Sequence, residues 1–507
     1  MSGIVYLVGA GPGDAGLMTV KGLGLLQQAD VIVYDRLVDE GLLSNVRSDA
    51  ELIYVGKSSG EHTVKQEDIN RILVAKAKEG KSVVRLKGGD PMVLGRGGEE
   101  AEALVANKIS FVVVPGVTSA IAVPEYAGIP VTHRGLAASF AVVTGHEDPS
   151  KESSSVEWGD LASAADTLVC LMGMGNLAAI VDELIKGGRS PETPVALIRD
   201  GTTPRQRTVV GKLSTIVKQA ERAKLKPPVV IVVGDVVNLR ERLAWFDKQP
   251  LFGKRVLVTR SRAQASVLSR MLAECGAEAV ELAVIEIKEL TDTSELDEAV
   301  AHLRDYHWII FTSVNGVEAV WRRMRAIGLD ARRFGAARIG AIGPATAERL
   351  QELGLYPDFI SQEYTSESIL KGMKKLGVSG CRILLPRSDI APRDLIDGLI
   401  RLGAEPFEVA AYRTVAPDDV ASEGKRRLLN GEIDVITFAS SSTVANLVAL
   451  LDGDVAAINK AKVACIGPAT ATAAEKAGIR VDIMAQEHTI SGLVAAMESY
   501  FKKGEEV

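Results

Sequence analysis

An internal repeat in the second half of the chain is the strongest constraint on its fold. The segment VLVTRS, which ends with Arg260 and Ser261, recurs as ILLPRS with Arg387 in the place of Arg260, and IIFTSVNGVEA recurs as ITFASSSTVAN at the same offset. A further pair, AIGPATAERL at Gly343 and CIGPATATAA at Gly467, has nearly the same offset. Self-similarity at a fixed period indicates a duplicated unit of secondary structure. Each copy reads strand, helix, strand, Ser/Thr-rich turn, strand and helix, which predicts a duplicated α/β structure.

A glycine-rich turn after a buried strand dominates the first half. Residues 83–86 (VVRL) read as the end of the strand, and the segment 87–91 (KGGDP) stops it, because proline cannot continue a strand ladder and glycine accepts positive φ. Glu99, Glu100 and Glu102 then open an apolar helix, where carboxylates suit the positive end of the helix dipole. Open α/β sheets bind small ligands at such strand ends.

A second glycine-rich turn, residues 9–16 (GAGPGDAG), follows a strand predicted over 4–8. It fits the G-x-G-x-x-G pattern, and Asp35 follows the next strand about where a Rossmann domain places its ribose acid. Pro12 and Asp14 argue against that dinucleotide site, because an acid repels a pyrophosphate. Two acidic strand-end turns suit a cationic or zwitterionic ligand, of which S-adenosylmethionine is an example. A nicotinamide or flavin site stays open as the alternative.

Composition narrows the remaining classes of function. At 507 residues, 47% of them hydrophobic and 24% charged, the chain is long enough for several α/β domains. A net charge of -6 without a basic, aromatic-rich run argues against nucleic acid as a partner, and no apolar segment is long enough for a membrane span, so we expect a cytoplasmic protein. Four isolated cysteines and six dispersed histidines give no reason to expect disulfides or a metal site.

Six segments of the first half resemble the tetrapyrrole methylases, and most of all uroporphyrinogen-III C-methyltransferase. In order along the chain they are GAGPGD, YDRLV, VRLKGGDPMVLGRGGEE, PGVTSAIAVPEYAGIPVTHR, TGH and DGTTPRQR. The resemblance covers about residues 1 to 245. It implies two small α/β domains with S-adenosylmethionine between them, a homodimer formed through this half, and methylation of uroporphyrinogen III at C2 and C7 to give precorrin-2.

The same resemblance implies the residues of the methyltransferase site. Asp35 matches the family's proposed proton acceptor and Lys57 its proposed proton donor. The reacting pyrrole carbon is already a nucleophile, so the enzyme mainly aligns it with the methyl group and handles the proton that the ring loses. Asp35 could instead stay ionised and stabilise the positive charge that forms on the ring. The positions that match the family's cofactor contacts are Pro12, Gly88, Gly89, Asp90, Val93, Thr118, Ser119, Met172 and Gly201.

The repeated second half resembles uroporphyrinogen-III synthase over about residues 251 to 507, through TSVNGVEA, IGPATA, EVAAYRT and FASSSTVANL. The resemblance implies two discontinuous Rossmann-like lobes joined by a two-stranded ladder. It also implies closure of hydroxymethylbilane, with inversion of the last pyrrole ring and without a cofactor. Tyr412 would assist departure of the hydroxyl group, and Arg260, Arg387 and Arg413 are candidates to pair with substrate carboxylates. The matching substrate contacts are Thr312, Ser313, Ser440 and Thr470.

Together these patterns predict a fusion of two consecutive tetrapyrrole enzymes, with domains at 1–245 and 251–507 and a linker at 247–253. The C-terminal half would make the substrate of the N-terminal half. A methyltransferase with a non-catalytic, ligand-binding C-terminal module is the alternative.

Overall fold

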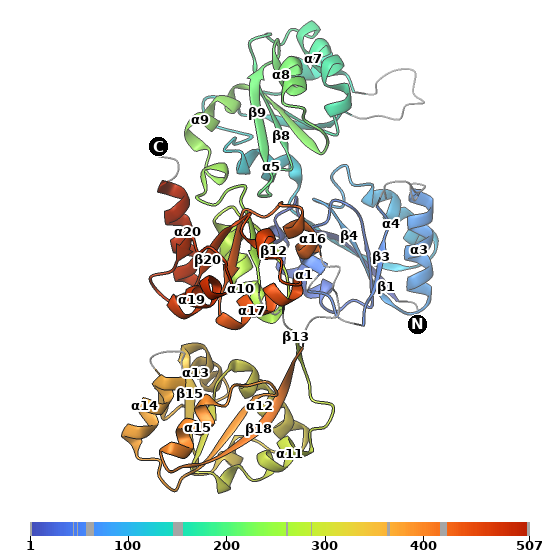
Figure 1. Cartoon of the computed structure of the whole chain (residues 1–507). Helices are drawn as coiled ribbons and strands as arrows, with labels where there is room; N and C mark the ends of the chain where they lie inside the picture. The colour runs from blue at the N-terminus through green and yellow to red at the C-terminus, as the bar shows by residue number, and fades with distance from the viewer. Residues whose placement is uncertain are drawn as a thin grey trace. The chain divides into compact units, whose positions relative to one another are not determined.

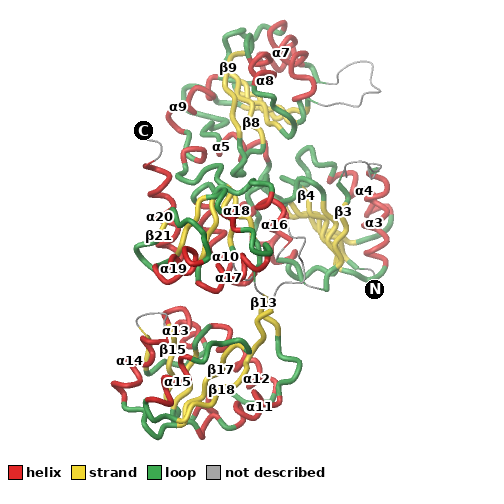
Figure 2. Tube along the Cα trace, in the orientation of Figure 1, coloured by secondary structure: helices red, strands yellow, loops and turns green. Residues whose placement is uncertain are grey.

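The computed structural model describes residues 3–503, apart from 44, 48, 57–64, 146–155, 260–261, 285, 362–365 and 416–422. Over this range the strands form four sheets with helices packed against them (Figures 1 and 2). By its internal contacts the chain divides into two compact units. One comprises residues 1–256, 270–279 and 494–507, and the other comprises 257–269 and 280–493. The predicted α/β fold is confirmed.

The first sheet is parallel throughout, as expected from its continuous apolar strands. Helix α1 (Val20–Leu26) packs through Leu26 on one face, and α3 (Gln66–Lys78) and α4 (Gly97–Ala106) pack through Leu73 and Leu104 on the other. The strand order is β3 (Glu51–Tyr54), β2 (Val31–Tyr34), β4 (Ser82–Lys87), β1 (Ile4–Gly9) and β5 (Ser110–Val114).

This order excludes the dinucleotide alternative. In a Rossmann domain the strand that carries the ribose acid lies beside the strand that carries the glycine turn. Here β4 lies between β1 and β2. The glycine turn after β1 is also followed by a short 3-10 helix (Ala15–Leu17) and not by a long helix that opens on a phosphate. The match to G-x-G-x-x-G is therefore coincidental.

The second sheet is mixed. Strands β6 and β7 are parallel, whereas β10 is antiparallel to both β7 and β8. Helix α5 (Ser119–Tyr126) leaves the first sheet and packs through Val123 on one face of the second, while α7 (Leu177–Lys186) and α8 (Ile216–Arg222) cover the other face. The strand order is β6 (Phe140–Thr144), β7 (Thr167–Leu171), β10 (Val229–Val233), β8 (Pro194–Arg199) and β9 (Arg207–Lys212).

The two sheets of the C-terminal half exchange strands between the sequence repeats. One sheet joins two strands of the first copy to three of the second, and the other joins four strands of the first copy to two of the second, so each sheet contains strands of both copies. Strand β13 (Glu286–Lys288) pairs antiparallel with the end of β18, as the predicted two-stranded ladder requires. One order is β12 (Glu278–Glu281), β11 (Arg255–Val258), β19 (Val435–Phe438), β20 (Lys462–Cys465), β21 (Ile483–Met484); the other is β13, β18 (Glu405–Val415), β17 (Arg382–Ser388), β14 (Trp308–Phe311), β15 (Arg338–Ile342), β16 (Phe359–Ser361).

The helices of the C-terminal half also follow the repeat. Helix α12 and its counterpart α17 each begin directly after a serine that caps the helix. Within the described residues, no helix is both long and apolar enough to cross a bilayer. The principal helices are α10 (Arg262–Glu274), α11 (Ser294–Ala301), α12 (Val314–Ala326), α13 (Gly343–Glu352), α14 (Ser366–Leu376), α15 (Asp394–Arg401), α16 (Glu423–Leu429), α17 (Ser441–Leu450), α19 (Pro468–Lys476) and α20 (Ile490–Lys503).

Candidate functional site

The two glycine-rich turns meet at the carboxyl ends of β1, β4 and β5. The amide of Gly89 donates to the carbonyl of Gly11 over 2.6 Å, and the amide of Gly11 donates back to Gly89 over 3.3 Å. A Cβ atom at Gly116, in the turn after β5, would lie 2.3 Å from the Gly89 carbonyl oxygen and 2.7 Å from the Cα of Gly9. Glycine is therefore required where these three turns meet, and the strand ends present backbone instead of side chains.

Asp90 shapes this junction through its carboxylate. One oxygen accepts the amides of Met92 (2.8 Å) and Val93 (3.1 Å), and the other accepts the amide of Gly116 (3.0 Å). The carboxylate of Asp14, in the first turn, accepts the Gly16 amide over 2.7 Å and the Tyr126 hydroxyl over 2.8 Å. From the two acidic turns we expected both charges to face a cationic or zwitterionic ligand. The structure instead shows both carboxylates accepting hydrogen bonds from the chain itself.

Most of the predicted cofactor contacts lie on loops that touch one another. Thr118 caps α5 by accepting the Ala120 amide, and a Cβ atom at Gly89 would lie 3.7 Å from the Ser119 amide. A Cβ atom at Gly13, next to Pro12, would lie 2.9 Å from a methyl group of Thr203. The loops that carry Pro12, Gly88–Asp90, Thr118–Ser119 and Gly201 thus form one neighbourhood.

Val93 and Met172 are exposed apolar side chains among the predicted contacts. Val93 is 38% exposed beside the Asp90 turn, and Met172 is 52% exposed at the end of β7 in the second sheet. Met172 also has a left-handed backbone, with φ at 58°. Methionine side chains are usually buried in the core, so the residue type alone predicts a buried Met172. The exposure of its side chain shows that Met172 is not a core residue in this structure.

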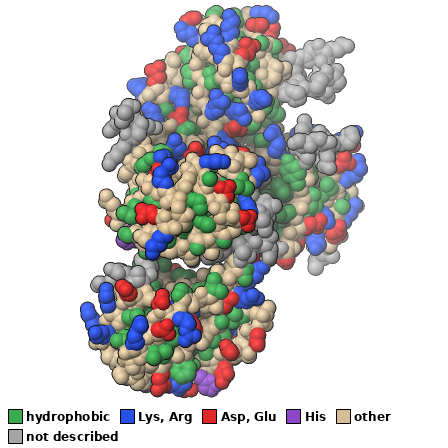
Figure 3. All heavy atoms as spheres, viewed as in Figure 1, with side chains coloured by type: hydrophobic (Ala, Val, Ile, Leu, Met, Phe, Trp, Pro, Cys, Tyr) green, Lys and Arg blue, Asp and Glu red, His purple; other side chains and the backbone are tan. Residues whose placement is uncertain are grey.

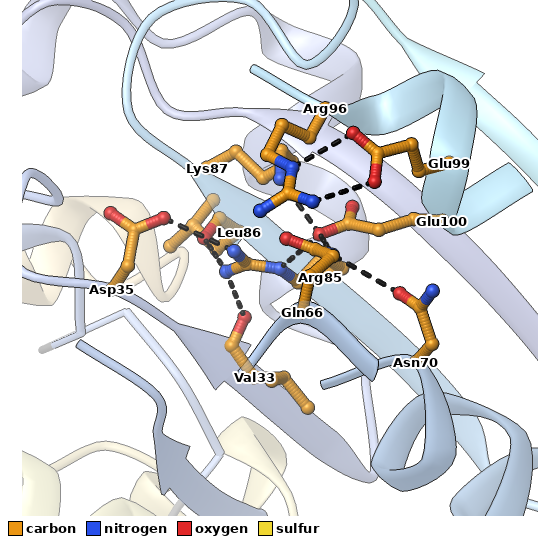
Figure 4. Close-up of polar contacts among 10 residues, drawn as sticks. All are labelled: Val33, Asp35, Gln66, Asn70, Arg85, Leu86, Lys87, Arg96, Glu99 and Glu100. Carbon is orange, nitrogen blue, oxygen red and sulfur yellow. Dashed lines mark hydrogen bonds and ion pairs between the residues drawn. The ribbon is translucent and has the colours of Figure 1, made fainter. Parts of the chain in front are cut away.

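Asp35, the predicted proton acceptor, lies at the end of β2 and is held by a buried arginine (Figure 4). One carboxylate oxygen accepts the Leu37 amide over 3.1 Å, and the other accepts Arg85 Nη2 over 3.2 Å. The Arg85 side chain is 4% exposed and that of Asp35 is 26% exposed. Arg85 Nη1 also donates to the carbonyls of Val33 and Leu86. The arginine is therefore fixed in the sheet, while the carboxylate keeps one side open.

Glu100 lies fully buried behind this pair. Its Oε1 accepts Arg85 Nε over 3.1 Å, Lys87 Nζ over 2.8 Å and Gln66 Nε2 over 3.1 Å. Its Oε2 has no hydrogen-bond partner among the described residues. Burial and the neighbouring Arg85 lower the pKa of Lys87, and Glu100 opposes that shift. The carboxylate of Glu100 thus pairs with two buried cations, Arg85 and Lys87, of which Arg85 also holds Asp35.

This buried cluster corrects the sequence interpretation of Glu100. The sequence predicted that Glu100, in the first turn of α4, complements the helix dipole together with Glu99 and Glu102. That description fits Glu99, which pairs with Arg96 at the surface. The signal for the cluster was present in VVRLK, because two cations two residues apart point to the same side of a strand that is otherwise buried. A chain that buries both needs a buried acid.

In the C-terminal half, the structure brings Ser313 and Tyr412 together. Their hydroxyl oxygens lie 3.1 Å apart, and Ser313 also caps α12 by accepting the Gly316 amide. Tyr412 is buried, at 8% exposure. Ser440, the repeat counterpart of Ser313, caps α17 in a capping box with Thr443. The residue that corresponds to Tyr412 in the other copy is Ile285, so the repeat keeps both serines but only one tyrosine.

Two predicted contacts of the C-terminal half are internal. Thr470 is 4% exposed in the first turn of α19, and its counterpart Thr346 is equally buried, so the contact of Thr470 with substrate stays a prediction. Arg387 is 6% exposed and donates to Glu408 (3.2 Å) and to the Pro392 carbonyl, which makes it an internal ion pair and not a surface cation.

The other predicted positions have different outcomes. Thr312 is partly exposed beside Ser313, and Arg413 is half-exposed, 3.7 Å from Asp389. Lys57 and Arg260 lie outside the described residues. On the face that Figure 3 shows, acidic and basic side chains are interspersed. Among the described side chains, no group of three or more histidine, cysteine, aspartate or glutamate residues is placed to hold a metal ion.

Comparison with known proteins assigns each half of the chain. Residues 4–217 match the family of tetrapyrrole (corrin/porphyrin) methylases, and residues 266–495 match the family of uroporphyrinogen-III synthase HemD. The porphyrin biosynthesis protein HemD of Ruminiclostridium josui is 39% identical over 492 residues, which is 97% of both chains. The chain belongs to both families. Its two halves are a methyltransferase domain and a synthase domain fused in one polypeptide.

Other relatives match the methylase half alone. The uroporphyrinogen-III C-methyltransferase of Methanocaldococcus jannaschii is 58% identical over 240 residues, which is 47% of this chain and 98% of that protein. Among solved structures, the uroporphyrin-III C-methyltransferase of Thermus thermophilus, crystallised with S-adenosylhomocysteine, is 41% identical. It covers 47% of this chain and 94% of that chain, with a TM-score of 0.41.

Proposed function

We propose that the chain carries out two consecutive steps of tetrapyrrole biosynthesis. The C-terminal half closes hydroxymethylbilane to uroporphyrinogen III, and the N-terminal half transfers two methyl groups from S-adenosylmethionine to C2 and C7 of that product, which gives precorrin-2. The observation that carries the proposal is the open carboxylate of Asp35, anchored by Arg85 at the edge of the sheet where three glycine turns meet.

The junction of glycine turns fits the cofactor. The three glycines let the turns after β1, β4 and β5 pack backbone to backbone, and Val93 and Met172 expose apolar side chains that the methylene groups and the adenine ring of the cofactor would contact. Asp90 and Thr118 hold the loops around it, and the amide of Ser119 lies beside Gly89. When bound, S-adenosylmethionine supplies a methyl group that its sulfonium makes electrophilic.

Asp35 handles the charge or the proton of the substrate ring. Methylation of a pyrrole carbon leaves a cationic ring that must lose a proton, and a carboxylate nearby either accepts that proton or stabilises the cation. Arg85 holds one oxygen of Asp35 and fixes the direction of the other. Because Arg85 is fixed in turn by Glu100 and two carbonyl groups, the geometry exists before the substrate binds.

Tyr412 and Ser313 provide the polar groups of the synthase half. Ring closure requires loss of a hydroxyl group from the linear substrate, and a phenol beside a serine hydroxyl can donate a hydrogen bond to the departing oxygen. Thr312, Ser440, Thr470 and Arg413 are the remaining positions proposed to contact the substrate. The enzyme's main task is to hold the chain so that the substituted end of the last ring reacts first.

One experiment tests both steps. The purified chain is supplied with hydroxymethylbilane, with and without S-adenosylmethionine, and the tetrapyrroles are identified by chromatography and mass spectrometry. We expect uroporphyrinogen III without the methyl donor and a dimethylated product with it. Spontaneous isomer I alone would support the alternative, a methyltransferase with a non-catalytic C-terminal module. Tight binding of a pyridine dinucleotide, with no binding of S-adenosylmethionine, would overturn the assignment of the N-terminal half.

We also propose that the chain forms a homodimer through its methyltransferase half and works in the cytoplasm. The proposal of a dimer is supported by the resemblance of that half to the methylases. Light scattering on the purified chain should give twice the mass of 53.9 kDa. A monomer at micromolar concentration would contradict it.

A further inference from the structure

Four residues form a closed ring of hydrogen bonds across the methylase half. The Tyr126 hydroxyl donates to Asp14 Oδ2 over 2.8 Å, and the Asp14 amide donates to Thr202 Oγ1 over 3.2 Å. The Thr202 amide donates to Gln206 Oε1 over 3.0 Å, and Gln206 Nε2 donates to the Tyr126 carbonyl over 3.3 Å. We call this ring the latch. It joins three segments that are far apart in the sequence.

Each segment of the latch also carries a predicted cofactor contact. Asp14 lies two residues after Pro12, in the turn that follows β1. Thr202 follows Gly201, and Tyr126 ends the helix that Thr118 and Ser119 begin. A Cβ atom at Gly201 would lie 2.4 Å from the side chain of Val123 in that helix. The latch therefore ties together the loops around the junction of glycine turns.

The Tyr126 side chain is held from behind. Its ring makes edge contacts with Trp245 and Phe246, with centroids 5.0 Å and 4.9 Å away, and the Trp245 indole donates to the Glu125 carbonyl. Burial, and then the hydrogen bond to Asp14, raise the pKa of Tyr126, so the hydroxyl stays protonated and is the donor. A fixed ring gives the hydroxyl one direction, which is toward Asp14.

The loop at Thr202 needs this support. Thr202 has a positive φ of 67° and Asp200 one of 48°, and for a β-branched residue such as Thr202 this backbone is strained. Strained backbone persists only where its surroundings determine it. Thr202 is 2% exposed, and both its amide and its hydroxyl are engaged in the latch. Without the latch, the loop beside Gly201 would lose the contacts that hold it in this conformation.

We propose that the latch sets the shape of the cofactor site, that Tyr126 is a positioning residue for S-adenosylmethionine, and that Asp14 acts through the latch instead of through its charge on the sulfonium. This inference rests on the proposed function of the N-terminal half.

Two variants of the full chain separate the latch from the charge. Tyr126→Phe keeps the ring that packs on Trp245 and Phe246 but removes the donor. Asp14→Asn removes the charge but keeps an oxygen for the Gly16 amide and an amide group that can donate to the Tyr126 hydroxyl. Calorimetry measures the affinity of each variant for S-adenosylmethionine and for S-adenosylhomocysteine, whose sulfur carries no charge. Tyr6→Phe, on β1, is the control for loss of a tyrosine hydroxyl.

We expect Tyr126→Phe to weaken both ligands by the same factor, roughly tenfold, as for loss of one hydrogen bond to a charged group. The methylation rate at saturating S-adenosylmethionine should stay near that of the parent chain. Asp14→Asn should weaken both ligands less than threefold, and Tyr6→Phe should weaken neither, because they leave the latch in place.

Three results would overturn the inference. Unchanged affinity in Tyr126→Phe would show that the latch does not position the cofactor. A loss in Asp14→Asn that affects S-adenosylmethionine but spares S-adenosylhomocysteine would assign Asp14 to the sulfonium charge. A fall in the saturated rate of Tyr126→Phe, with affinity unchanged, would place Tyr126 in the reaction instead. Failure of the parent chain to bind either ligand would refute the proposed function itself, which is a distinguishable outcome.

Discussion

The buried carboxylate of Glu100 shows how one side chain can organise a site that it does not reach. Its carboxylate forms ion pairs with Arg85 and Lys87, and of these two cations Arg85 is the one that also pairs with Asp35. Removing one partner of a buried ion pair leaves an uncompensated charge, which costs far more than loss of a surface pair. The effect of Glu100 on methylation should therefore pass through the position of Arg85.

Replacement of Glu100 by glutamine tests this chain of contacts. The amide keeps the size of the side chain but leaves Lys87 without its paired carboxylate and Arg85 with Asp35 alone, so we expect a loss of about 3 kcal/mol in stability. The rate of methylation at saturating substrate should fall at least tenfold, because Arg85 no longer orients Asp35. Cyclisation by the other half is the internal reference, and Glu102→Gln, at an exposed position of the same helix, is the matched control. An unchanged methylation rate in folded protein would contradict the expectation.

Tyr412 is the second residue whose hydroxyl can be tested alone. Tyr412→Phe keeps the buried ring in its core and removes the oxygen that lies beside Ser313. We expect the enzymatic rate of formation of uroporphyrinogen III to fall by tenfold or more, with a larger share of the spontaneous isomer I. Chromatographic separation of the two isomers measures this ratio. Tyr306→Phe, which alters a partly buried tyrosine of the same lobe, should leave the ratio unchanged.

At the scale of elements, the repeat of the C-terminal half does not coincide with its folding units. The core beneath the first of its sheets combines Leu257 and Val280, from the start of this half, with residues from 428 onward. The two cores of the other sheet lie entirely within residues 287–412. Each lobe therefore needs strands from both copies of the repeat.

This exchange predicts which fragments fold. A fragment of residues 286–415 contains the complete second sheet and both of its cores, so we expect a cooperative thermal transition by circular dichroism. A fragment of residues 251–377 spans one sequence repeat, but it separates β11 from β19 and β14 from β17, so we expect no such transition. Cooperative folding of the second fragment, or failure of the first, would contradict the pairing of strands.

At the scale of the whole molecule, the segment between the two enzymes is folded. The predicted linker, 247–253, follows Trp245 and Phe246, which pack with Tyr126 and Phe252 in one aromatic group. Its backbone also forms hydrogen bonds, from Leu251 to the Cys275 carbonyl over 3.0 Å, for example. The domain boundary at 245 and 251 stays a prediction, but the segment at that boundary is part of the first compact unit.

Loss of Phe246 should therefore weaken the methylase half. Phe246 is 6% exposed, and large-to-small replacement of a buried phenylalanine costs about 3–5 kcal/mol. In calorimetry of the full chain, Phe246→Ala should lower the thermal transition that S-adenosylmethionine raises. Leu243→Ala, at a position that is 47% exposed, should leave that transition within a degree or two. An equal shift of the transition temperature in Phe246→Ala and Leu243→Ala would indicate that burial of Phe246 does not stabilise the methylase half.

Local patterns in the sequence determined the class of fold and much of the site. Apolar runs ended by glycine and proline predicted the strands at β1, β4 and β5, because backbone conformation and burial are properties of short segments. The match of ordered motifs predicted the families, and the offset of the repeat predicted the duplicated half. These features need no knowledge of which strands become neighbours.

Tertiary structure decided which side chains meet. The sequence could not show that β4 separates β1 from β2, that Glu100 faces two cations, or that Tyr126 reaches Asp14 across 112 positions of the chain. Such contacts depend on the order of strands in a sheet and on the packing of helices against it, and any one segment is compatible with several orders. For the same reason the sequence could not show that Arg387 and Thr470, both candidates to contact the substrate, are buried in folded lobes.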